Sequence, residues 1–584
     1  MKKIYKLLAV LFGVTFLMSG LAGCNRGDGD VQRVDSQKTQ LYVKYYSGGL
    51  GNAWLDQCMA DFETKFADYS FEEGKRGIQF MKDFEKITIQ VDLVAGNPSQ
   101  LFIMEGSDYN EFVSKGVLMD LTDIVTSPAV TGPDQKESET ISSKISAERQ
   151  SYYNVGTASE PAYYGIPFYE SSLSAIYNVD LFDEQGWYLR ADADTENMTY
   201  EDLQSYEKVY SLFVRPGSDA ARSAGPDGKT AAAGEAYGYD DGLPATYKDF
   251  QALLTCIVSS SVYPFIWNGY STDYLTSFAL EAWANNSGCD EIKLSLTMGE
   301  SGKSSLTLVD LNGDGTIKKE NGEPVLRSST EITEDNGYLL HLQEGKLDAL
   351  SLVKMMIGAG YYGDSFSPSF SHRMAQGYFI NGYEKGTVDK PIAMLIDGSW
   401  WNSEARTDYT SENERMTKRF ATLPLPSPEK RESGEEVRNV KISERSSWMF
   451  IKKNCDPAAL KAAKMFMSYL QSDEALNTFS VNTDMLRAMD YEVTEQNLNK
   501  MSYYGRDNYR LSRAETTDWV DWVPMSDATK SNPSLVEANV WGFSNGSISN
   551  PFIYFAENRS ATVEDYFLDI YNYYCGDNGS NWTL

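Results

Sequence analysis

The first folded stretch of the chain alternates β-like and helical patterns, and this alternation restricts the fold more than any other feature of the sequence. Residues 40–46 form a β-like run, and residues 52–66 then carry apolar side chains at helical spacing. Two further β-like runs follow at residues 87–93 and 100–104. Strands that alternate with helices predict an α/β fold with a mainly parallel sheet. In such sheets ligands bind at the loops beyond the carboxyl ends of the strands.

The chain is longer than a single hydrophobic core usually organises, since it has 584 residues. Its hydrophobic fraction of 42%, with 13% aromatic residues, is typical of globular proteins. We therefore expect two or more domains. The formal net charge of −31 disfavours nucleic-acid binding, which needs clustered Lys and Arg side chains.

The amino terminus has the pattern of a secretory signal peptide. Basic residues at positions 2, 3 and 6 precede an almost wholly apolar run over residues 7–18, and small residues then lead to Cys24. That run is shorter than the roughly 20 apolar residues that span a bilayer. A cysteine directly after Leu-Ala-Gly resembles a lipobox, which implies that residues 1–23 are removed and that Cys24 carries the lipid. The alternative is an ordinary signal peptide with an incidental cysteine.

Residues 24–38 are mostly polar and Gly-rich and predict a flexible tether. No later segment is apolar for long enough to cross a bilayer. We therefore expect a lipid-anchored protein on the extracellular face of a bacterial cytoplasmic membrane.

Six segments, in order, resemble the family 1 extracellular solute-binding proteins of ABC importers, the class that includes maltose-binding protein. They are LYVKYYSGGLGNAWLDQCMADFETKF, LFIMEGSDYNEFVSKGVLMDLTDIV, a GIP…YN…LF…G block over residues 165–186, a helix start at 244–250, a DGSWW turn at 397–401 and an AAKMFMSYLQSDEALNTF helix at 462–479. The resemblance implies the two-lobe, type II periplasmic-binding-protein-like fold, whose lobes close on a ligand about a hinge.

The resemblance also implies that the chain crosses between the lobes more than once. We expect residues 39–165 plus 426–480 in the first lobe and residues 166–425 plus 481–584 in the second. Compared with a compact member of the family, extra length falls around residues 190–240 and 285–345 and after residue 490. Insertions near the cleft would reshape the pocket, so the identity of the ligand does not carry over.

The function implied by the resemblance is capture of a small solute outside the cell and its delivery to the permease subunits of an ABC importer. A sugar offers flat C–H faces and a rim of hydroxyls, so its site needs aromatic rings and planar polar groups. The chain supplies 38 Tyr and 11 Trp, which favours a sugar or oligosaccharide. A surface glycoside-active enzyme and a sensing or adhesion lipoprotein are the alternatives, because a fold does not determine function.

Catalytic motifs do not accompany this pattern. The chain has only two histidines, His341 and His372, and no G-x-S-x-G, H-E-x-x-H or G-x-x-x-x-G-K motif. Five cysteines besides Cys24 are widely spaced without a C-x-x-C pair, which favours isolated thiols over disulfides or a metal site. We therefore expect a binding protein that requires no cofactor.

Position in the pattern selects the candidate ligand-binding residues. They follow predicted strands, lie at the junction after the GIP turn, or belong to the DGSWW turn. The set is Trp54, Glu105, Phe168, Tyr169, Glu170, Tyr263, Trp267, Asp397, Trp400, Trp401, Trp448 and Arg487. Most aromatic side chains pack in cores, so a core position is the alternative for each of them. One of Trp400 and Trp401, together with Glu105 and Glu170, is the strongest choice, because two adjacent tryptophans cannot easily both face a core.

A possible calcium loop begins at Asp310. Asp310, Asn312, Asp314 and Thr316 match the alternating oxygen ligands of an EF-hand-type loop, and a glycine at 315 permits the sharp turn. Position 12 of the loop is Asn321 instead of the usual glutamate. The alternative is a plain β-hairpin with an Asp-Gly turn. Any calcium would be structural and would lie in an insertion.

Overall fold

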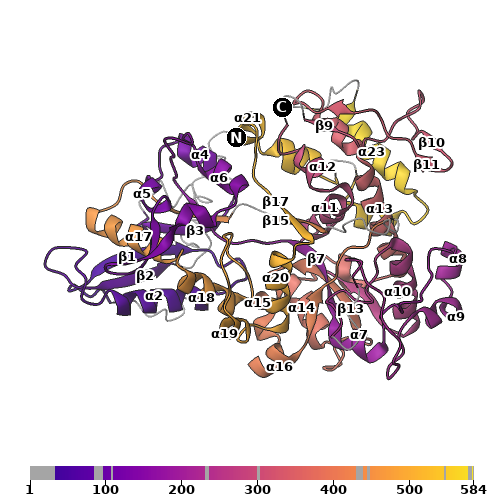
Figure 1. The fold of residues 1–584 in the computed structure, drawn as a ribbon, viewed down its shortest axis with the longest axis horizontal. Helices are drawn as coiled ribbons and strands as arrows, with labels where there is room; N and C mark the ends of the chain where they lie inside the picture. Colours follow the sequence, from indigo (N-terminus) through magenta and orange to yellow (C-terminus); the bar gives the residue numbers. More distant parts are fainter. Residues whose placement is uncertain are drawn as a thin grey trace, which may run out of the picture.

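The computed structural model describes residues 33–83, 97–106, 109–229, 236–298, 303–428, 439–443, 447–544, 548–576 and 582. These residues form two α/β bodies side by side, which we call lobe 1 and lobe 2 (Figure 1). The predicted signal peptide, Cys24 and the strand predicted at residues 87–93 lie outside the described residues. No helix in the described part of the chain is long and apolar enough to cross a membrane.

Lobe 1 is built on a sheet in which five described strands have the order β2-β1-β3-β16-β6. Its strands are β1 (Thr39–Tyr45), β2 (Ile78–Asp83), β3 (Leu101–Glu105), β6 (Ile166–Pro167) and β16 (Ser447–Ile451). β1 pairs in parallel with β2 and β3, whereas β16 runs antiparallel to β3 and β6. The strands predicted at residues 40–46 and 100–104 are thus confirmed. β2 escaped prediction, although its alternating burial is typical of a half-buried strand.

Helices α2 (Ala53–Lys65), α17 (Pro457–Tyr469) and α18 (Asp473–Thr483) bury their apolar faces in the same core as this sheet. α17 begins at Pro457, because the Asp456 carboxylate accepts from the amides of the first turn and Pro457 occupies the first helical position. The single helix predicted over residues 462–479 is wrong. The side chain of Ser472 accepts from Ala475 N and starts α18 as a separate helix.

Lobe 2 is built on a sheet in which four described strands have the order β14-β7-β13-β8. Its strands are β7 (Leu173–Asn178), β8 (Tyr263–Ile266), β13 (Ile392–Gly398) and β14 (Phe420–Thr422). Successive side chains of a strand point to opposite faces. Accordingly, Met394 and Ile396 pack into one core while Leu395 packs into another. Both faces of this sheet are therefore covered.

The large core on one face of this sheet is formed mainly by α10 (Tyr247–Ser259), α11 (Asp273–Ser287) and α13 (Glu344–Ala359). α10 begins at a capping box in which Thr246 and Asp249 satisfy each other's backbone amides, which confirms the predicted helix start. The C-terminal helices α22 (Pro551–Glu557) and α23 (Val563–Cys575) pack on α13 (Figure 1). α14 (His372–Asn381) and α15 (Trp401–Glu404) contribute to the core on the other face.

The chain crosses between the lobes where β6 leads into β7. It returns between β15 (Asn439–Ser443), whose Val440 and Ile442 pack in lobe 2, and β16 in lobe 1. Residues 485–501 contribute apolar side chains to the core of lobe 1, and β17 (Thr517–Asp521) pairs in parallel with β15. The lobe boundaries given above stay a prediction, and this packing favours moving residues 439–443 to lobe 2 and 485–501 to lobe 1.

The described residues also form further α-helices and strands. They are α4 (Tyr109–Ser114), α5 (Thr122–Val125), the hairpin β4 (Pro128–Gly132) and β5 (Gln135–Thr140), α6 (Ala147–Tyr153), α7 (Val179–Gln185), α8 (Tyr200–Leu203), α9 (Tyr206–Val209), α12 (Cys289–Lys293), β9 (Ser304–Ser305), β10 (Lys319–Glu320), β11 (Glu323–Pro324), β12 (Thr330–Glu331), α16 (Glu412–Thr417), α19 (Glu495–Leu498), α20 (Tyr503–Arg513) and α21 (Asp527–Ser531).

Candidate functional site

The loop after β1 carries two consecutive glycines that the site requires. Gly48 and Gly49 have φ values of +50° and +88°, a region that side chains rarely adopt. A Cβ at Gly48 would overlap Oε1 of Glu105, and a Cβ at Gly49 would lie 3.1 Å from Oε1 of Glu404. The consecutive Cα atoms are about 3.8 Å apart. One carboxylate from each lobe therefore lies against this glycine pair.

Glu105 is the last residue of β3, so it occupies the carboxyl end of a parallel strand, where ligands bind in such sheets. The hydroxyl of Tyr169 donates a hydrogen bond to its Oε1. Tyr169 follows β6 on the segment that joins the two lobes. The hinge segment thus holds a carboxylate of lobe 1 in place.

Trp400 follows β13 of lobe 2 and is half-buried. Its ring lies over Gly398, where a Cβ would overlap it, and it meets Tyr274 edge to face with ring centroids 5.6 Å apart. The same ring packs against the core of lobe 1. One helical turn later, Ser403 Oγ donates a 3.2 Å hydrogen bond to Leu50 O of the glycine loop. The two lobes therefore meet along the start of α15.

The acidic groups on the lobe 2 side share one amide. Nε2 of Gln376 donates to Oδ2 of Asp397 at 3.0 Å and to Oε2 of Glu404 at 2.8 Å. Nε2 of His372 lies 3.3 Å from Oε1 of Glu404. Burial, and secondarily the neighbouring charge of Glu404, raises the pKa of Asp397 to about 8. Asp397 is therefore mostly protonated at neutral pH.

Together these groups offer carboxylate oxygens beside a partly exposed indole ring. Carboxylates accept hydrogen bonds from hydroxyl or amine groups, and an indole face packs against apolar C–H surfaces. An anionic group would meet the charges of Glu105 and Glu404, which disfavour it. The arrangement suits a neutral, polyhydroxylated molecule.

A family model described as bacterial extracellular solute-binding protein matches residues 78–476, more than half of the chain. The chain belongs to this family.

Solved structures that resemble this chain share little of its sequence. The raffinose-bound protein RafE is 12% identical, with a TM-score of 0.49 over 92% of this chain and 99% of that one. A chitin oligosaccharide binding protein is 15% identical, with a TM-score of 0.46 over 92% and 99%. A mannobiose-bound ABC-transporter binding protein from Bifidobacterium animalis subsp. lactis is 13% identical, with a TM-score of 0.48 over 92% and 93%. No curated protein sequence matches the chain. The family match, together with the two α/β lobes, confirms the predicted two-lobe fold.

Five of the predicted aromatic residues lie deep inside this solute-binding protein. Their side chains are at most 1% exposed; they are Trp54, Phe168, Trp267, Trp401 and Trp448. Trp54 packs on Phe168 with ring centroids 5.5 Å apart and donates from its indole N–H to Tyr45. In this structure the five rings pack in cores, which is the alternative given for each of them above. Their role in ligand contact stays a prediction.

Glu170 points away from the group around Glu105. Tyr169 and Glu170 are consecutive, and successive side chains of an extended chain point to opposite sides. Oε1 of Glu170 accepts a 2.8 Å hydrogen bond from Nη1 of Arg149, which also pairs with Asp521. These three residues line a cavity of about 370 Å³. Burial raises the pKa of Glu170 despite the nearby Arg149 charge.

Arg487 is fully buried behind the hinge segment. Its Nε donates to the carbonyl of Phe168, and its Nη2 donates to Oε1 of Gln471 at 3.0 Å. Burial lowers its pKa to about 10. Tyr263 lies at the other end of the sheet from Trp400, because it pairs with Ile392 at the start of β13. The structure therefore brings together Glu105, Tyr169, Asp397 and Trp400 of the predicted set.

Several residues of the site escaped prediction. Gln376, His372 and Tyr274 lie far from the DGSWW turn in sequence, and nothing in their neighbourhood marks them. Glu404 could have been found, because it lies four residues after Trp400, on the same side of a helix. The glycine pair also escaped prediction, although two glycines in a loop beyond a strand can indicate close approach by another group.

The predicted calcium loop forms a hairpin turn in which Leu311 and Ile317 bridge. The carboxylate of Asp310 lies 3.4 Å from Lys318 Nζ and 3.8 Å from Arg327 Nε, and Asp314 accepts from the hydroxyl of Thr316. In the described ranges no group of three or more His, Cys, Asp or Glu side chains could hold a metal ion. These contacts favour the plain hairpin, and calcium binding stays the untested alternative.

Proposed function

We propose that the site between the glycine pair, Glu105, Tyr169, Trp400 and Glu404 captures a neutral sugar or oligosaccharide. The observation that carries this proposal is that each lobe contributes one carboxylate against the same two glycines. A ligand held by both carboxylates would bridge the lobes and favour their closure. The half-buried Trp400 ring beside them supplies an apolar surface for a sugar face.

Charge narrows the class of sugar. Both carboxylates can accept hydrogen bonds from the hydroxyls of a bound sugar. These bonds reduce the free-energy cost of removing the carboxylates from water. A uronate or a sugar phosphate would place a second negative charge beside them, and like charges in a closing site repel strongly. The proposed ligand is therefore an uncharged glycan.

The proposed function includes delivery of the sugar to an importer and attachment of the protein to the membrane. The loaded protein would present the sugar to the permease subunits of an ABC importer, while a lipid on Cys24 would hold it at the outer face of the membrane. The protein would release its sugar unchanged, without cleavage. Labelling with a radioactive fatty acid and a Cys24→Ser variant test the anchor, since only the cysteine form should incorporate the label.

Titration with matched sugars tests the ligand class. We expect glucose-type, mannose-type or galactose-type oligosaccharides to raise the melting temperature, because a ligand that binds only the folded state stabilises it. The matching uronates should give no shift. Chromatography of the recovered sugar should show it intact. Equal shifts from uronates, or none from any neutral sugar, would refute the proposal, and cleaved product would show an enzyme instead.

A further inference from the structure

Asp484 ends α18 in a backbone conformation that few side chains adopt. Its φ is +56°, and the residue is 1% exposed. Glycine takes this left-handed conformation without steric cost, whereas aspartate adopts it where its short side chain is held by local hydrogen bonds. The position therefore carries a charged side chain where the backbone alone favours glycine.

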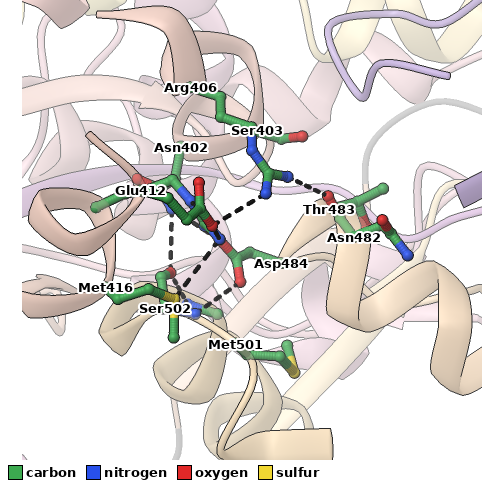
Figure 2. A network of polar contacts seen from close by, with 12 residues as sticks. Asn402, Ser403, Arg406, Glu412, Met416, Asn482, Thr483, Asp484, Met501 and Ser502 are labelled. Atoms are coloured by element: carbon green, nitrogen blue, oxygen red, sulfur yellow. Dashed lines mark hydrogen bonds and ion pairs between the residues drawn. The ribbon is translucent and has the colours of Figure 1, made fainter. Parts of the chain in front are cut away.

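Three elements converge on this carboxylate. Oδ2 accepts a 2.8 Å hydrogen bond from Nδ2 of Asn402 on α15 and pairs with Nη1 of Arg415 on α16. Oδ1 accepts a 3.0 Å hydrogen bond from the backbone N–H of Ser502, the residue that caps α20. Figure 2 shows Asn402 and Ser502 directed at Asp484. A Cβ at Gly505 would overlap Oδ1, so the carboxylate is closely enclosed.

The network joins the two lobes. α18 packs in the core of lobe 1 through Phe479. Trp401 and Tyr409, which come before and after Asn402 in the chain, pack in a core of lobe 2. A second connection runs parallel to it, because Arg406 donates to the carbonyl of Asn482 at 3.1 Å (Figure 2). Arg415 is 3% exposed and Asp484 2% at their side chains, so the ion pair lies in the interior of this junction.

α15 carries the lobe 2 wall of the ligand site. Trp400 precedes it, Ser403 reaches the glycine loop, and Glu404 lies against Gly49. A helix of four residues cannot hold itself in place, because helices this short are unstable without tertiary contacts. Asn402, in the middle of this helix, is the residue held by Asp484.

We propose that Asp484 is a positioning residue for ligand capture, which fixes α15 and with it Trp400 and Glu404 against the glycine loop. The inference rests on the proposed function for the meaning of that site, but the placement of α15 is testable without any sugar. The carboxylate acts through Asn402 and Arg415 and does not itself contact the proposed ligand.

Hydrogen exchange of the sugar-free protein tests this placement. In Asp484→Asn, exchange in peptides covering residues 399–407 and 46–52 should accelerate about tenfold or more, because breaking a buried charge pair raises the population of locally open states. Asp507→Asn is the matched control. Asp507 is a buried acid on α20 whose own side chain pairs with Arg510 on the same helix and accepts from Thr422 N on β14.

The control should lower the melting temperature without changing exchange in either peptide. The double variant Asp484→Asn/Arg415→Gln removes a buried guanidinium that in Asp484→Asn keeps only the exposed Glu412 as its charged partner. It should therefore recover part of the melting temperature while exchange at residues 399–407 stays fast. Unchanged exchange in Asp484→Asn, equal acceleration in Asp507→Asn, or full recovery of protection in the double variant would overturn the proposal. Because no sugar is present, these outcomes are independent of whether the sugar proposal holds.

Discussion

The hydroxyl of Tyr169, on the hinge segment, donates a hydrogen bond to the carboxylate of Glu105 at the end of β3 in lobe 1. This hydrogen bond connects the segment that joins the two lobes to an acceptor in the candidate site. Glu105 also lies against Gly48, so its position depends on both the loop and the hinge. Removing either partner should therefore affect binding more than folding.

Tyr169→Phe tests the hinge contact. The variant loses one hydrogen bond to a charged acceptor, so the dissociation constant for the best sugar of the panel should rise about tenfold. The melting temperature should change little, because the ring remains buried. Isothermal titration calorimetry measures the affinity, and Tyr383→Phe, at a position 54% exposed, is the control that should bind normally. Normal binding by Tyr169→Phe would contradict the assignment.

Gly48→Ala tests the close approach of Glu105. Gly48 and Gly51 both have positive φ, +50° and +73°, but a Cβ at Gly51 has nothing within 4 Å. Both alanine variants should lose about 1 kcal/mol through backbone strain. Only Gly48→Ala should also displace Glu105 and abolish sugar binding. Urea unfolding and calorimetry separate the two effects, and equal binding by both variants would argue against a site at Gly48.

The adjacent tryptophans should respond differently to truncation. Trp401 is fully buried among Phe379, Phe420 and Tyr504, so Trp401→Ala should cost about 3–5 kcal/mol of unfolding free energy. Trp400 is half-buried, so Trp400→Ala should cost about 1 kcal/mol. The second variant should nevertheless be the one that loses sugar binding while folded. The opposite pattern would place Trp400 in the core.

Asp397 should make stability depend on pH. Its pKa is about 8 in the folded protein and about 4 when unfolded. Between these values the folded state holds a proton that the unfolded state has released, so stability falls as pH rises from about 4 to 8 and levels above that. The asparagine of Asp397→Asn does not titrate in this range. The melting temperature of the wild type minus that of the variant should therefore decline as the pH rises from about 4 to 8. A constant difference would show that the carboxyl titrates normally.

Calcium at the Asp310 loop can be tested by chelation. Because Lys318 and Arg327 already lie by the Asp310 carboxylate, we expect a chelator to leave the melting temperature unchanged. Added calcium should likewise have no effect on the protein or on an Asp314→Ala variant. A calcium-dependent rise that Asp314→Ala removes would establish the metal site.

Local pattern and the family resemblance together predicted much of the architecture. The strand at residues 40–46 and the helix that follows it, the strand at 100–104 and the helix start at 244–250 are determined by side chains close together in the sequence. The DGSWW segment was placed beside the site through the family resemblance, because it is one of the six matching segments. Such features need no knowledge of distant residues.

Tertiary structure alone decided which side of each element meets the site. A strand pattern shows that Tyr169 and Glu170 face opposite ways, yet only packing determines that Glu105 meets the first and Arg149 the second. Packing likewise determines that Trp401 lies in a core while Trp400 is half-buried. It also determines that Glu404 of the other lobe lies against the glycine pair. Residues hundreds of positions apart cover these faces, and short-range periodicity carries no information about which distant segment does so.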